Sequence, residues 1–244
     1  MFQNTPLGNL YPVWEIYETN TESPIRWSLY HEKNPDLLKQ TSFSHTASFL
    51  SVALPVLWRL AKYANYDIFL LIYAISRHDV PEWLRNIDVH GPRKTEKDDL
   101  AEYEAFHEKI RHLPKDLYKI EERAYLLQFA AKCPEIFPTQ AKEVMRRLKE
   151  TNPSDVLAFP ALESWEYAFY GYHVYKKHNY PVTLTHVLRT ELFKLQKSAA
   201  TLPGFREEIF THEYEEWVLK FLEEHKDVPE GREYFKEHYV VAEK

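Results

Sequence analysis

Glycine is scarce in this sequence, with only 5 glycines among 244 residues, whereas aromatic residues make up 15% of the chain. Doubly wound and all-β folds need glycine in their tight turns and phosphate-binding loops, so a chain this poor in glycine suits neither. Helical proteins need far less of it. With 44% hydrophobic residues and enough length to bury a real core, the sequence predicts a globular all-α protein.

Charge and cysteine content exclude several classes of protein. The net charge is −6 with both signs interspersed, so we expect no nucleic acid as a partner. The single cysteine excludes an internal disulfide framework and a cysteine-rich metal site. The N-terminus lacks the pattern of a signal peptide, and the longest apolar stretch, near residues 69–74, is too short to cross a bilayer. We therefore expect a cytoplasmic protein without a membrane partner.

Prolines and apolar periodicity divide the chain into three parts. Residues 1–40 contain four prolines and are expected to form an irregular segment that packs on the domain. Residues 41–180 are expected to form a helical domain, and residues 181–244 a C-terminal helical extension of it. Helices are predicted over residues 45–63, with Pro55 as a kink, and over 66–77, 96–112, 115–133, 139–150, 155–178, 182–198 and 204–225.

A group of histidines and carboxylates in the first half of the chain is the best candidate for chemistry. His45 opens a long helix, and the adjacent pair His78-Asp79 ends the next one. Imidazole nitrogens and a carboxylate suit borderline divalent ions, which activate water and hold phosphoryl oxygens. Glu82 lies one helical turn beyond His78 and is placed to orient water or transfer a proton. The alternative is that each histidine is a hydrogen-bonded structural residue, and that Asp88 is a loop or capping carboxylate.

Four short motifs, taken in order, resemble the HD-domain phosphohydrolases, in particular their 5′-deoxynucleotidase branch. The motifs are Arg26-Trp27-Ser28-Leu29, Ser44-His45-Thr46, His78-Asp79-Val80-Pro81-Glu82 and Ile87-Asp88-Val89. A later acidic helix that ends in Leu113-Pro114 also resembles that family. The resemblance covers about residues 24–120. It implies an HD-domain helical bundle with a metal-dependent phosphohydrolase activity.

The resemblance assigns roles to individual residues. It implies that His45, His78 and Asp79 bind a divalent metal ion, although Mn, Co, Fe, Ni, Zn and Mg cannot be distinguished. It implies that Glu82 acts as a general acid or orients the water, and that Asp88 lies close to the sugar or the attacking water.

The same resemblance implies that Arg26 and Trp27 bind the substrate, a small phosphorylated molecule of the nucleotide class. A guanidinium group suits phosphate, and an indole ring can close against a sugar face that lacks a 2′-hydroxyl. The alternative is a surface arginine beside a core tryptophan. A homodimer is also implied by the resemblance.

The family's remaining aspartate ligand, on a later helix, has no direct counterpart. The two alignable segments place Ala131 or Pro160 at its position, and neither can bind a metal. Asp155 lies four or five residues earlier and Glu163 one helical turn later, and we assign Asp155 as the remaining ligand. Two other family residues differ as well, since Ser44 replaces a glutamate and Ile87 a glycine.

Two functions follow from this departure. One is a working phosphohydrolase that acts on nucleoside 5′-monophosphates or a similar small phosphate ester. The other is a catalytically lapsed HD scaffold that binds a nucleotide or a protein partner, because losing an anionic ligand weakens a divalent site. A separate aromatic segment, residues 165–172, is interpreted as core, with a dimer interface and a substrate wall as alternatives.

Overall fold

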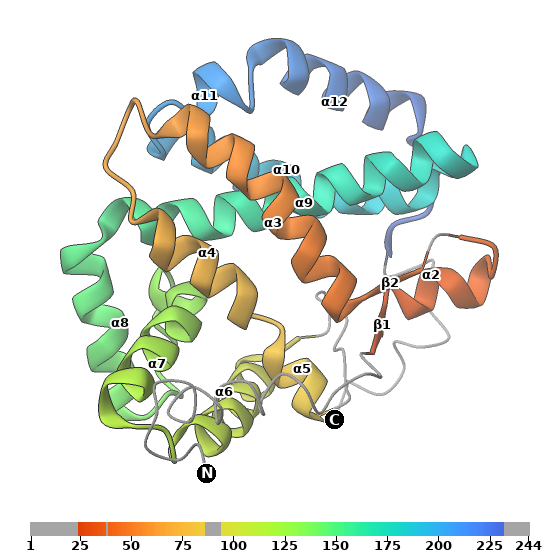
Figure 1. The fold of residues 1–244 in the computed structure, drawn as a ribbon. Helices are drawn as coiled ribbons and strands as arrows, with labels where there is room; N and C mark the ends of the chain where they lie inside the picture. Colours follow the sequence, from red (N-terminus) through yellow and green to blue (C-terminus); the bar gives the residue numbers. More distant parts are fainter. Residues whose placement is uncertain (1–23, 38, 86–93, 232–244) are drawn as a thin grey trace. The chain divides into compact units, whose positions relative to one another are not determined.

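The computed structural model describes residues 24–37, 39–85 and 94–231, and these are helical for most of their length (Figure 1). The prediction of an all-α fold is confirmed. Within these ranges the strands are two-residue segments, β1 (Ile25–Arg26) and β2 (Gln40–Thr41), which pair antiparallel with Arg26 opposite Gln40. No helix in the described ranges combines the length and apolar character needed to cross a membrane.

The chain forms two compact units, each built from three separate stretches of sequence. Among the described residues, unit 1 contains 24–26, Gln40–Ser51 and Tyr66–Phe159, and unit 2 contains Trp27–Lys39, Val52–Asn65 and 160–231. One boundary, between Lys39 and Gln40, lies next to the division that the sequence analysis placed at residue 40, whereas those near residues 51 and 159 fall inside helices.

A proline lies close to each of the two unit boundaries that fall within a helix. Pro55 is inside α3 (Ser42–Leu60), and Pro160 is inside α9 (Pro153–His178). Proline lacks the N–H that would bond to the preceding turn, so the backbone ladder of each helix is interrupted there.

Unit 1 is a bundle of helices. It contains the start of α3 and of α9, together with α4 (Ile68–Arg77), α5 (Val80–Arg85), α6 (Glu96–Ile110), α7 (Lys115–Ala130) and α8 (Thr139–Thr151). Helix α7 packs against α4, α6 and α8, and α5 packs against α6 (Figure 1). Phe106 and Tyr125 stack with ring centroids 4.4 Å apart in the buried core between α6 and α7.

Unit 2 contains the remainder of α3 and α9 together with α2 (Ser28–Lys33), α10 (Pro181–Thr201), α11 (Phe205–Glu208) and α12 (His212–Glu224). Helix α10 packs against both α11 and α12. The sequence analysis predicted one helix over residues 204–225, and this was wrong. The chain leaves the helix at Ile209, and Thr211 then caps a new one by accepting a hydrogen bond from the backbone N–H of Tyr214 at 3.2 Å.

Helix α2 corrects the expectation that residues 1–40 are irregular. Pro24 and Pro35 enclose a proline-free interval that is long enough for a short helix. Its side chains Leu29 and Tyr30 are buried against Tyr170 in unit 2, and this burial stabilises a helix too short to be stable alone.

Candidate metal centre

His45 is positioned by the capped first turn of α3. The side chain of Thr41 accepts a hydrogen bond from the backbone N–H of Ser44 at 3.1 Å, and Ser44 Oγ accepts one from the backbone N–H of Thr41 at 2.8 Å. This reciprocal pair satisfies N–H groups that the helix itself cannot satisfy. It fixes the start of α3, so that the fully buried His45 faces the interior of unit 1.

His78 and Asp79 lie at the junction of two helices. Helix α4 ends at Arg77, His78 forms its C-cap, and α5 begins at Val80. The chain changes helix within two residues, and both side chains are buried.

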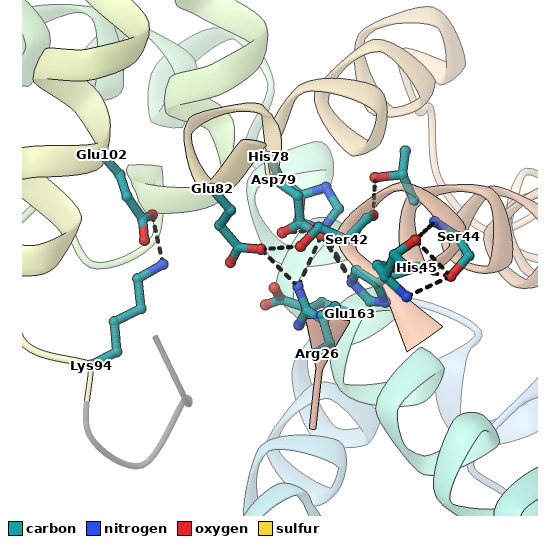
Figure 2. A network of polar contacts seen from close by, with 12 residues as sticks. Arg26, Ser42, Ser44, His45, His78, Asp79, Glu82, Lys94, Glu102 and Glu163 are labelled. Carbon is teal, nitrogen blue, oxygen red and sulfur yellow. Dashed lines mark hydrogen bonds and ion pairs between the residues drawn. The ribbon is translucent and has the colours of Figure 1, made fainter. Parts of the chain in front are cut away.

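The structure brings His45, His78 and Asp79 together, which confirms the prediction that these three side chains meet (Figure 2). The two Nε2 atoms are 3.2 Å apart, His78 Nε2 lies 3.1 Å from Asp79 Oδ1, and His45 Nε2 lies 3.7 Å from Asp79 Oδ2. Two ligand atoms bound to one ion at about 2.1 Å are roughly 3.0–3.4 Å apart. Two separations fall in this range and the third, to the other oxygen of Asp79, is slightly longer, so the three side chains lie close enough together to hold one ion.

The tautomer of His78 is fixed by its second nitrogen. His78 Nδ1 lies 2.6 Å from the carbonyl oxygen of Ile75, and a carbonyl can only accept a hydrogen bond. Nδ1 therefore carries the proton, and in the neutral ring the lone pair is on Nε2, which faces His45 and Asp79. Metal-binding histidines in proteins are typically oriented by such a bond.

The surroundings of the cluster favour the protonation states that a metal requires. Burial, followed by the positive charge of Arg26, lowers the pKa of His45 well below its ordinary value, so its imidazole is neutral at pH 7. Burial opposes ionisation of Asp79, but Arg26 and the two histidines together lower its pKa to about 2. A neutral His45 imidazole and an ionised Asp79 carboxylate are the forms of these two side chains that bind a cation.

Aromatic rings enclose the histidine side of the cluster. The ring of Phe49 meets that of His78 edge-on, with centroids 5.3 Å apart, and Phe159 lies 6.1 Å from the same imidazole. Both phenyl rings are buried, so the charges at the cluster interact in a medium of low dielectric constant.

Arg26 and Glu82, which the resemblance assigned to substrate binding and catalysis, extend the polar network of the cluster. Arg26 Nη1 donates to Asp79 Oδ2 at 2.9 Å and to Glu82 Oε2 at 3.4 Å. Ser42 Oγ donates to the same Glu82 oxygen at 2.7 Å. One positive and two negative side chains leave this group, without the histidines, at a net charge of −1.

Two polar residues at or near this site were missed by the sequence analysis. The contact of Ser42 with Glu82 spans 40 positions along the chain, so no local pattern indicates it. Lys94 Nζ binds Glu102 at 2.7 Å, and its charge contributes to lowering the pKa of Asp79. The acidic sequence of α6 was the only available signal for that ion pair, and it did not identify the lysine.

Asp155 is not brought to the cluster, contrary to its assignment as the remaining ligand. It lies in the first turn of α9, where Oδ1 accepts from the backbone N–H of Asp67 at 3.0 Å and Oδ2 from the side-chain amide of Asn152 at 2.9 Å. The carboxylate thus satisfies donors at the starts of α9 and α4. Glu163, the alternative, lies in unit 2 and accepts from Tyr167 Oη at 3.2 Å.

Trp27 lies in unit 2, and Asp88 falls outside the described residues. Trp27 has a left-handed backbone conformation with φ of 62°, and its ring stacks on Tyr170 with centroids 5.0 Å apart.

The fold and the cluster define an all-α protein with a buried His-His-Asp group suited to a divalent cation. Comparison with protein-family models, with curated proteins and with solved structures finds no match to this chain.

Proposed function

We propose that this protein is a metal-dependent phosphohydrolase of the HD type, acting on nucleoside 5′-monophosphates or a similar small phosphate ester. The observation that carries the proposal is the set of separations between 3.1 and 3.7 Å among the ligand atoms of His45, His78 and Asp79. Three protein ligands leave further positions on an ion for water and substrate. A bound divalent ion would supply an acidified water molecule and positive charge for the phosphoryl oxygens.

The protein's own residues supply the other requirements of phosphate ester hydrolysis. Arg26 binds both carboxylates through one nitrogen, Nη1, and its guanidinium suits a phosphate dianion. Glu82 is held by Ser42 and Arg26, which limits its rotation and keeps the carboxylate oriented to accept or return a proton.

A lapsed scaffold that binds a nucleotide or a protein is the second candidate. Two observations favour it: Arg26 already binds Asp79 Oδ2, and Asp155 is engaged elsewhere. A site with two histidines and one carboxylate holds its ion less firmly than one with a second anionic ligand.

Metal content and phosphate release distinguish the two candidates. Wild type, a His78→Ala/Asp79→Ala variant and a matched His112→Ala/Asp116→Ala control, which alters exposed side chains of unit 1, are loaded with Mn or Co. They are then assayed on ribo- and deoxynucleoside monophosphates. The hydrolase predicts phosphate release by wild type and the control and none by the cluster variant.

Other outcomes would decide against the proposed activity. Cluster-dependent metal binding without release from any substrate would favour the lapsed scaffold. Absence of both bound metal and release would contradict the proposal. Equal release by all three proteins would show that a contaminant or another site is responsible.

A further inference from the structure

Unit 2 contains a groove that the proposed function does not use. Its volume is about 540 Å³, within the range of small-molecule sites. We call it the aromatic groove. The lining residues that matter here are Arg59, Trp165, Phe169, Tyr172, Tyr214 and Trp217.

The walls of the aromatic groove come from the segment that the sequence analysis interpreted as core. Trp165, Phe169 and Tyr172 lie at helical spacing on α9, and Phe169 is 52% exposed. Tyr172 meets Trp217 of α12 edge-on, with centroids 5.8 Å apart. A concave surface with several accessible aromatic rings suits a flat, apolar ligand.

The charges at the groove select an anion. Glu208 is also part of the lining, but its carboxylate binds Lys62 Nζ at 2.5 Å and Tyr63 Oη at 3.0 Å, so its charge is balanced. Arg59 is exposed, and among the described residues its guanidinium makes one long bond, at 3.4 Å to the backbone oxygen of Glu208. The remaining donors of Arg59 are therefore available to an anionic ligand in the groove.

The phenol groups of Tyr172 and Tyr214 add hydrogen-bond donors to the lining of the groove. Burial, followed by the neighbouring Tyr172, raises the pKa of Tyr214, so its hydroxyl stays protonated at neutral pH. Within the described part of the chain, neither the Tyr172 hydroxyl nor the Tyr214 hydroxyl makes a hydrogen bond, so both can donate to an acceptor on a ligand.

We propose that the aromatic groove is a binding site for a small planar aromatic carboxylate, with Arg59 as the carboxylate-binding residue and the rings of α9 and α12 as the walls. The groove shares no residue with the metal cluster, and its ligand carries a carboxylate in place of a phosphate ester.

Isothermal titration calorimetry with 2-naphthoate and its neutral isostere 2-naphthamide tests the proposal on the full chain. Wild type is expected to bind one naphthoate saturably and the amide about tenfold more weakly, the contribution of one charge-assisted contact. Arg59→Gln should remove this preference by weakening naphthoate alone, while the control Lys197→Gln, an exposed lysine of unit 2 outside the lining, should retain it.

A second pair of variants tests the walls without relying on Arg59. Phe169→Ala should weaken both ligands severalfold, and Trp58→Ala, which alters an 82% exposed ring outside the lining, should weaken neither. Circular dichroism establishes that each variant is folded. Absence of saturable naphthoate binding, equal affinity for acid and amide, or a preference that survives in folded Arg59→Gln would each overturn the proposal.

Discussion

At the scale of single residues, Arg26 acts both on the proposed metal ligands and on the proposed metal ion. It contacts Asp79 Oδ2 and Glu82 Oε2 and lowers the pKa of Asp79 and of His45. The same charge that keeps the ligands in their metal-binding states also repels a divalent ion and occupies an oxygen that the ion would share. Arg26 therefore lowers the affinity of the site for the metal ion and in return supplies a positive charge that can bind the substrate.

Replacing Arg26 with glutamine should separate these effects. Its removal changes the charge of the group formed with Asp79 and Glu82 from −1 to −2, so the affinity for Mn or Co should rise about tenfold, or ~1.4 kcal/mol. Phosphate release should fall, because the substrate cation is lost. Calorimetry and the phosphate assay measure the two quantities. A decrease in metal affinity would instead mean that Arg26 is needed to hold Asp79 in place.

Asp155→Ala should behave as a structural substitution. It removes the acceptor for the backbone N–H of Asp67 and for Asn152, so the free energy of unfolding should fall by about 1–2 kcal/mol. Metal affinity should not change, because neither oxygen belongs to the cluster. Denaturant titration and calorimetry measure both. Loss of metal from a folded variant would restore Asp155 as a ligand.

At the scale of elements, the sequence predicted most helices and the meeting of His45, His78 and Asp79. Apolar periodicity and proline positions indicate where helices run. Because His78 and Asp79 are adjacent in sequence, only His45 of these three ligands had to be brought in from another helix. The break before α12 was missed because Ile209 and Phe210 before Thr211, and Tyr214 after it, continue an apolar pattern at helical spacing. The contact of Ser42 with Glu82 was missed because local pattern contains no information about pairs so distant in sequence.

Substitution of Gly204 tests whether the turn between α10 and α11 requires a left-handed backbone conformation without a Cβ. Its φ is 79°, in the left-handed region, and a Cβ there would collide with the ring of Tyr63. Gly204→Ala should therefore lower the free energy of unfolding by about 2–4 kcal/mol through strain and the clash. At Gly231 an added Cβ would meet only ordinary contacts with His186, so Gly231→Ala is a matched control. Thermal unfolding of the two variants provides the comparison, and equal stabilities would contradict this account.

At the scale of the whole molecule, buried histidines connect the stability of both units to pH. Burial lowers the pKa of His31 and His186 in unit 2, as it does for His45 in unit 1. In unit 2, His186 Nε2 donates to the carbonyl of Pro229 at 2.7 Å, and Nδ1 accepts from Tyr30 Oη at 3.0 Å, so the neutral ring is the one that fits. Protonation of His186 would turn its accepting nitrogen into a donor.

Acidification should therefore destabilise the protein. The unfolded chain binds protons at an ordinary histidine pKa of about 6.5, whereas the folded chain binds them only at lower pH. The free energy of unfolding should thus decrease as pH falls from about 6.5 toward the lowered pKa values. Melting temperatures across this range measure the decrease, which should be smaller in His186→Gln. An unchanged slope in that variant would contradict the assignment to His186.

The interleaving of the two units also constrains how this protein can have evolved. Each unit takes its residues from three stretches, and two of the divisions fall within the helices α3 and α9. No single contiguous gene segment encodes either unit, so neither can be acquired, lost or exchanged by recombination as a cassette. Insertions and substitutions, rather than domain shuffling, are the changes by which this architecture can diversify.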